Sequence, residues 1–151
     1  MTEPAGGTPA ADAPPVTGVL ETALYVADVD RSAEFYRGLF GSRVLLDEPG
    51  RMRALDVAGR QVLLLFKTGA SERQNPVPGG VVPPHDARGH IHVCFAVPAD
   101  ALGAWETHLA ALGVDVVSRV HAERGGTSLY LRDPDGHLVE LATPGLWEGV
   151  Y

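Results

Sequence analysis

The stretch TSLYLRDPDGHLVELA, residues 127–142, decides the fold of this chain. Its centre, Asp133-Pro134-Asp135-Gly136, is typical of a tight turn, because Pro fixes φ and Gly accepts a positive φ. Apolar and polar residues alternate on both sides of the turn, which is typical of half-buried strands. Glu140 shares a face with Leu138 and Ala142. A carboxylate there requires a partner, hydrogen bonds or a bound cation, unless it is an exposed residue on an edge strand.

The bulk composition narrows the class of protein. A length of 151 residues with 45% hydrophobic and 21% charged residues predicts one globular domain. The net charge of −7 disfavours nucleic acid and anionic membranes as partners. Cys94 is the single cysteine, so no internal disulfide can form, and we expect a cytoplasmic protein. Residues 1–16 are rich in Pro, Ala, Gly and Thr and predict a disordered tail before a single domain at 17–151.

The hairpin is part of a pattern that occurs twice in the chain: a strand, a helix and three strands. In the second copy, a strand at 90–97 and a helix at 99–112 precede a strand at 114–120 and the hairpin. The first copy has a strand from Val19 to Val26 and a helix that begins after Asp28 or Asp30 and ends at Gly41. Three further strands are then expected at 44–46, 52–57 and 60–66.

The repeat predicts two modules, at about 19–69 and 90–145, joined by a long irregular loop at 70–89. In each first strand, one face is apolar and is expected to lie under the helix of its own module. The opposite face is small or polar and carries Glu21 in the first module and His92 in the second. Glu140 lies on the corresponding face of the last strand. Small neighbours, such as Ala23 and Ala96, leave room for a ligand there.

The motif DPDGHLVEL, residues 133–141, resembles the closing motif of the vicinal oxygen chelate superfamily. That superfamily includes glyoxalase I, bleomycin-resistance proteins, fosfomycin-resistance enzymes and extradiol dioxygenases. The resemblance implies an α+β fold in which two βαβββ modules form an open, mixed, barrel-like sheet with the helices outside. In this superfamily, the metal ligands come from the first and last strands of each module. Carried over by position, they are Glu21, His92 and Glu140, with the apolar Leu63 or Leu64 at the fourth place.

One imidazole and two carboxylates suit Mn²⁺, Fe²⁺, Zn²⁺, Co²⁺ or Ni²⁺ and leave positions open for two neighbouring substrate oxygens. The implied function is a metal-dependent enzyme in which Glu21 or Glu140 also acts as a base, and we expect the three ligands to converge on one cation. The alternative is a metal-free protein of the bleomycin-resistance type that sequesters a small antibiotic. Glu21 would then pair with an arginine such as Arg132, and His92 would be an ordinary interior histidine.

Further side chains are candidates for substrate contact, and a homodimer is expected. Tyr130 and Arg132 lie on the same face of the hairpin as Glu140. His85, in the long loop, could reach over the cavity or could be a solvated loop residue. The apolar C-terminal end suggests buried surface, and modules of this fold commonly complete their cavities by pairing. The candidate substrate-binding residues are Tyr130, Arg132, His85 and Phe66.

Overall fold

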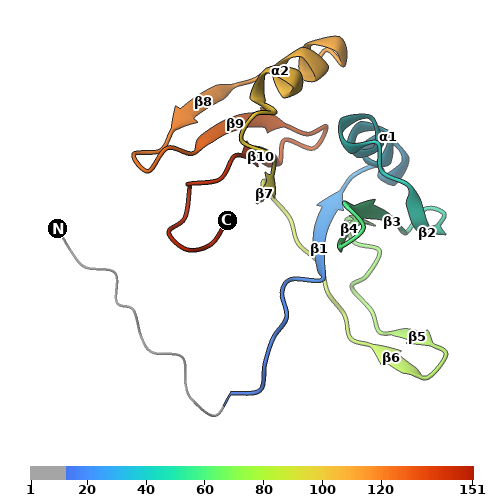
Figure 1. The fold of residues 1–151 in the computed structure, drawn as a ribbon. Coiled ribbons are helices and arrows are strands. Elements are labelled where there is room, and N and C mark those ends of the chain that lie inside the picture. The colour runs from blue at the N-terminus through green and yellow to red at the C-terminus, as the bar shows by residue number, and fades with distance from the viewer. Residues whose placement is uncertain (1–12) are drawn as a thin grey trace.

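The computed structural model describes residues 13–151, which form two four-stranded sheets, two helices and a small hairpin (Figure 1). The first module contains β1 (Glu21–Val26), α1 (Val29–Phe40), β2 (Val44–Glu48), β3 (Met52–Val57) and β4 (Gln61–Lys67). The second contains β7 (His92–Ala96), α2 (Leu102–Ala111), β8 (Ser118–His121), β9 (Thr127–Arg132) and β10 (Leu138–Ala142). The strand orders, β1-β4-β3-β2 and β7-β10-β9-β8, are the same in both modules. The expected α+β fold of two βαβββ modules is confirmed.

The first helix begins and ends where the sequence predicts. The side chain of Asp28 accepts a hydrogen bond from the backbone N–H of Arg31 and caps the helix. Gly41 has a φ of 65° and ends it in the left-handed conformation. The second helix begins at Leu102, three residues later than expected, and has no side chain that caps it. Without a capping side chain, the start of a helix is poorly specified by the sequence.

Two segments differ from the expectation. Residues 114–117 are not a strand, so β8 is shorter than predicted and begins at Ser118. The long loop contains a two-stranded hairpin, β5 (Asn75–Val77) and β6 (Gly80–Val82), which extends away from the first module (Figure 1). Pro78 and Gly79 form its two-residue turn, with a φ of 97° at Gly79. Pro76 and Pro78 make this segment look irregular in the sequence. Proline is nevertheless tolerated in a pair of strands with free edges.

The larger of two hydrophobic core clusters joins the two modules. Leu24 and Val26 of β1 and Leu129 and Leu141 of the second sheet are all fully buried in it. The two helices lie next to each other over this core, and His108 of α2 lies with Nε2 3.0 Å from the carbonyl oxygen of Gly38 (Figure 1). No helix within residues 13–151 is long and apolar enough to cross a membrane. Of the expected tail, residues 13–16 have no helix or strand, and residues 1–12 lie outside the described part of the chain.

The turn between β9 and β10, residues 133–137, fixes the second module against the first, and we call it the clasp turn. Asp133 is buried, and its Oδ2 accepts a hydrogen bond of 2.7 Å from the hydroxyl of Tyr36 in α1. Asp135 Oδ2 accepts a hydrogen bond of 3.1 Å from the buried hydroxyl of Ser32. Two carboxylates of one turn therefore bind one helix of the other module.

The same turn also binds the end of β1. Asp135 Oδ1 accepts a hydrogen bond of 2.8 Å from the backbone N–H of Ala27. The buried imidazole of His137 accepts at Nδ1 from the N–H of Ile91 and donates from Nε2 to the carbonyl oxygen of Tyr25, at 3.1 and 2.8 Å. Because Nδ1 accepts, His137 is the tautomer protonated on Nε2. These contacts hold the two sheets in a fixed relation.

Candidate metal centre

The register of the second sheet brings His92, Glu140 and Tyr130 to one face. β10 pairs in parallel with β7, with Leu138 opposite His92 and Glu140 opposite Cys94. It pairs in antiparallel fashion with β9, with Glu140 opposite Tyr130. Residues directly opposite in a sheet project to the same side. Two of the three predicted metal ligands therefore lie on adjacent strands of one sheet.

The side chains of His92 and Glu140 are in direct contact. His92 Nδ1 lies 3.0 Å from the carbonyl oxygen of Leu138, so Nδ1 carries a proton and donates it. His92 Nε2 lies 3.1 Å from Glu140 Oε2. In a neutral imidazole this Nε2 has only a lone pair, and a carboxylate oxygen is also an acceptor. The contact therefore requires a proton or a cation between the two atoms.

Glu140 has unused capacity to bind a cation. Its residue is 4% exposed, and its Oε1 is buried with no hydrogen-bond partner within residues 13–151. Burial and then the Glu140 carboxylate raise the pKa of the Tyr130 phenol. Partial burial and then the same carboxylate raise the pKa of the Cys94 thiol to about 12. Both neighbours therefore remain neutral at pH 7, and neither offsets the charge of Glu140.

The spacing of these donors fits a shared divalent cation. Two ligands that each lie about 2.1 Å from one ion, at right angles to each other, are about 3 Å apart. The separation between His92 Nε2 and Glu140 Oε2 is 3.1 Å. The hydrogen bond from Nδ1 to Leu138 fixes the ring orientation and tautomer that a ligating imidazole needs. This pair can supply two of the ligands of a cation and leave the other positions open.

Glu21 does not join this pair within one chain. It lies at the start of β1, exposed, on the first sheet. Within residues 13–151, no three His, Cys, Asp or Glu side chains lie close enough together to hold a metal ion. The register also identifies the fourth place. Val62 is opposite Glu21 as Leu138 is opposite His92, so the counterpart of Glu140 is Leu64, which cannot bind a metal.

Two candidate substrate-binding residues lie at the first module instead: Phe66 is in β4, and His85 of the long loop packs against it, with ring centroids 4.6 Å apart. Phe66 is buried in a small cluster on the same face as Tyr25, and their rings stack with centroids 5.9 Å apart. Burial and then the nearby Asp86 raise the pKa of Tyr25, and its hydroxyl forms a hydrogen bond of 2.8 Å with His85 Nδ1. His85 of the long loop therefore lies against Phe66 and Tyr25 of the first sheet, and its contact with a substrate stays a prediction.

The other two candidates, Tyr130 and Arg132, lie on the second sheet. The Tyr130 ring stacks on the His92 ring, with a centroid distance of 6.4 Å and an interplanar angle of 28°. Tyr130 therefore borders the pair of His92 and Glu140. Arg132 is exposed and donates a hydrogen bond of 3.0 Å to the carbonyl oxygen of Gly136, so it lies at the clasp turn and away from Glu21.

Sequence reasoning missed the role of the clasp turn and the environment of Cys94. Asp133, Asp135 and His137 were interpreted only as turn residues, although three charged or titratable side chains exceed what a turn needs. These additional polar side chains are the feature of the sequence that could have predicted contacts with other elements. Cys94 enters the sequence analysis only as the single cysteine, but it is exposed and lies opposite Glu140. Its alternation with His92 along one strand already placed it on the polar face.

Comparison with known proteins finds relatives that match most of this chain. A metallothiol transferase FosB of Shouchella clausii is 27% identical over 135 residues, which cover 88% of this chain and 84% of that protein. A lactoylglutathione lyase of Pseudomonas aeruginosa is 31% identical over 150 residues and covers 83% of this chain and 81% of its own length. The crystal structure of a lactoylglutathione lyase from Agrobacterium tumefaciens superimposes with a TM-score of 0.81 at 36% identity, covering 89% of this chain and 99% of that one.

The profile of one superfamily matches residues 18–141, which is nearly all of the part that carries the two modules. The matched region contains Glu21, His92 and Glu140. The chain belongs to the glyoxalase/bleomycin resistance protein/dioxygenase superfamily.

Proposed function

We propose that this protein is a metal-dependent enzyme that acts on a small substrate with two neighbouring oxygens. His92 and Glu140 hold the divalent cation. The observation that carries this proposal is the buried Oε1 of Glu140, which has no partner within residues 13–151, beside a His92 Nε2 that faces the same carboxylate. The similarity to a metallothiol transferase and to lactoylglutathione lyases supports it. Mn²⁺, Fe²⁺, Zn²⁺, Co²⁺ and Ni²⁺ all accept this donor set.

We propose Glu21 of a partner subunit as the third ligand, in a homodimer. Glu21 is exposed on the first sheet and is not near the pair in its own chain. A second copy can therefore present its first sheet to the second sheet of this chain. Exposed apolar side chains support pairing: Leu20, next to Glu21, and Trp147 in the C-terminal segment are each 68% exposed.

The chemistry follows from the groups around the pair. A bound divalent cation would polarise two adjacent substrate oxygens and stabilise the negative charge that develops on them. Tyr130 borders the pair, and because its pKa is raised it stays protonated and donates a hydrogen bond to a substrate oxygen. Glu21 of the partner subunit or Glu140 would also act as the base that takes a proton from carbon or oxygen of the substrate. In this dimer, His85 and Phe66 of the partner subunit, which belong to the module that carries Glu21, would contact the rest of the substrate.

The proposal predicts stoichiometric metal that depends on His92. Purified protein loaded with Mn²⁺, Zn²⁺ or Ni²⁺ and then desalted should hold about one ion per chain by elemental analysis. His92→Ala should lose it, since the imidazole is one of the donors. His90→Ala is the matched control, because it removes an exposed histidine two residues away on the same chain and should keep the ion. Wild-type protein that binds none of these ions would contradict the proposal.

A mixture of variants tests whether the partner subunit completes the site. Glu21→Gln and His92→Ala each damage every site in their own homodimers. If Glu21 comes from the partner, heterodimers formed by refolding a mixture of the two will contain one intact site and will recover part of the metal. No recovery would mean that each chain binds its ion alone.

The alternative function is a metal-free protein that sequesters a small molecule. One observation favours it: a His92 imidazole that carries both protons donates to Glu140 Oε2 without any metal, and Glu21 lies elsewhere. In that case, the wild type and His92→Ala would both lack metal, and ligand binding would not change on addition of a chelator.

A further inference from the structure

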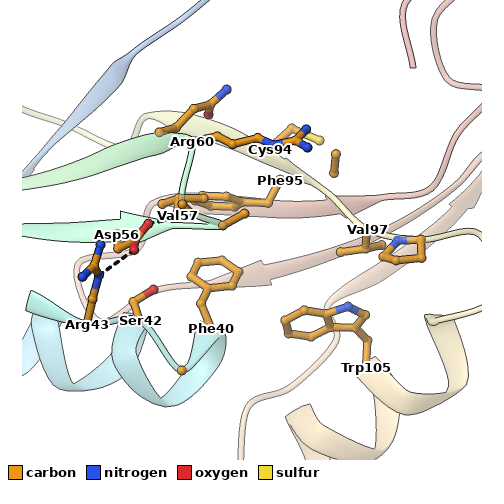
Figure 2. Close-up of a pocket in the computed structure, with 16 residues that line it drawn as sticks. Phe40, Ser42, Arg43, Asp56, Val57, Arg60, Cys94, Phe95, Val97 and Trp105 are labelled. Atoms are coloured by element: carbon orange, nitrogen blue, oxygen red, sulfur yellow. Dashed lines mark hydrogen bonds and ion pairs between the residues drawn. The ribbon is translucent and has the colours of Figure 1, made fainter.

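A cavity of about 700 Å³ opens between the two modules, next to the candidate metal centre, and Cys94, which lies opposite Glu140, is in its lining (Figure 2). The end of α1, the turn between β3 and β4, the end of β7 and Trp105 of α2 line it. Neither His92 nor Glu140 is among the lining residues. Its volume lies in the range of about 300–1,000 Å³ that is typical of sites for small molecules.

The cavity exists because the first module has no equivalent of the clasp turn. The β3–β4 turn, residues 58–60, occupies the same place in its module that the clasp turn occupies in the second. It has no side chain that bonds to α2 or β7. Asp56, at its base, turns back to its own module, where it accepts from the N–H of Gly59 and from Arg43 at 2.7 and 2.9 Å. The three polar side chains of the clasp turn close the space between the modules at that turn, whereas the corresponding space at the β3–β4 turn stays open.

Aromatic rings form the wall of the cavity on the side of the helices. The rings of Phe40 and Phe95 lie with centroids 4.5 Å apart, and those of Phe40 and Trp105 lie 6.1 Å apart. Figure 2 shows Phe40 and Trp105 on one side of the cavity and Arg60 on the opposite side. Such rings favour a flat aromatic guest, which can stack on them or meet them edge-on.

The charged lining leaves one positive charge without a partner. The hydrogen bond from Arg43 and the one from the Gly59 N–H lower the pKa of Asp56, so its carboxylate is ionised and offsets Arg43. Arg60 forms no ion pair within residues 13–151. The cavity is therefore locally positive in a chain whose formal net charge is −7. A guanidinium at the mouth of an aromatic site is suited to a carboxylate, sulfonate or phosphate.

We infer that this cavity is a second binding site, separate from the metal centre, for a flat aromatic molecule that carries an acidic group. The aromatic part lies against Phe40 and Trp105, and the acidic group binds Arg60. The site needs neither the cation nor the partner subunit's Glu21, so it stands or falls independently of the proposed activity.

Anilinonaphthalene sulfonate, an aromatic sulfonate with environment-sensitive fluorescence, is a suitable probe of this site. In a Trp147→Phe background, Trp105 is the single tryptophan, and its emission should be quenched as the probe binds with a stoichiometry of one per chain. Arg60→Gln should weaken binding about tenfold or more, which is the range for one charge-assisted contact. Trp105→Leu, followed by the emission of the probe itself, should weaken it by a similar factor.

Arg73→Gln is the matched control, since it removes an exposed arginine from the long loop, far from the lining, and should bind the probe as the wild type does. His92→Ala should also leave the affinity unchanged. Equal affinity in Arg60→Gln and Arg73→Gln would overturn the inference. So would failure of the probe to quench Trp105, which is the result expected if a second copy of the chain covers the cavity in solution.

Discussion

The clasp turn and the β3–β4 turn occupy equivalent places in two modules of the same topology, yet only one of them bonds to the other module. The clasp turn extends over five residues and carries Asp133, Asp135 and His137. The β3–β4 turn has three residues, Ala58-Gly59-Arg60, whose side chains make no hydrogen bond to the second module. A duplicated module therefore repeats its sheet without repeating its contacts. The polar side chains of one short turn decide whether two modules close on each other or leave a cavity.

The strongest test of this comparison replaces one carboxylate at each turn: Asp133, the first residue of the clasp turn, and Asp56, the residue of β3 at the base of the other turn. Asp133 accepts from the Tyr36 hydroxyl and from the N–H groups of Asp135 and His137, so Asp133→Ala leaves three donors unpaired in a buried place. We expect a loss of about 3 kcal/mol in the free energy of unfolding, measured by urea titration. Asp56→Ala is the matched change in the other turn and should cost far less, because its partners are exposed. Equal losses would show that the two turns contribute alike.

A smaller effect is expected when the partner of Asp133 is changed, and it depends on pH. Tyr36→Phe removes one buried hydrogen bond and should cost about 1–2 kcal/mol at neutral pH. Burial and then Asp133 raise the pKa of Tyr36 above its ordinary value of 10.0. The folded protein therefore keeps the phenol protonated where the unfolded chain ionises it. This contribution to stability is complete below pH 10 and is lost as the pH rises above it.

Because the phenylalanine variant has no such group, the difference in stability between the wild type and Tyr36→Phe should narrow as the pH is raised above 10. Denaturant titrations at several alkaline pH values measure this difference directly. A gap that stays constant would mean that the Tyr36 phenol ionises alike in the folded and unfolded chains.

The smallest effect is expected at the edge of the clasp. Ser32→Ala removes one hydrogen bond to Asp135, which retains the N–H of Ala27, and should lower the stability by about 1 kcal/mol. Arg31→Ala, which removes a half-exposed ion pair of 3.5 Å to the same carboxylate, should cost less still. If Arg31 proves more important than Ser32, the clasp is held by charge at the surface and not by its buried bonds.

The sequence predicted the parts of the fold that depend on local patterns. Asp28 and Gly41 mark the ends of the first helix, and the alternation around Glu140 gives the closing hairpin and its faces. The same alternation correctly placed His92 on the side of Glu140. Predictions from the sequence failed where no local pattern marks an element, as at the start of α2, which has no capping side chain.

The periodicity of hydrophobic residues could not predict how the two modules pack against each other. Which face a residue occupies follows from its own strand, but whether Glu21 meets His92 depends on how two sheets pack. That packing is set by contacts such as the one between Asp133 and Tyr36, whose partners lie almost a hundred residues apart. The cavity at Arg60 arises in the same way, from a contact that one module makes and the other does not.

The strand order also determines when the candidate centre is assembled during folding. β9 and β10 are neighbours in sequence and pair through a tight turn, whereas β7, which carries His92, pairs in parallel with β10 from the other end of the module. Closing a short loop costs less entropy than closing a long one, so local hairpins form before distant parallel strands are added. During refolding we therefore expect Glu140 to lie on a formed hairpin before His92 pairs beside it. On this expectation the donor pair is completed late in folding.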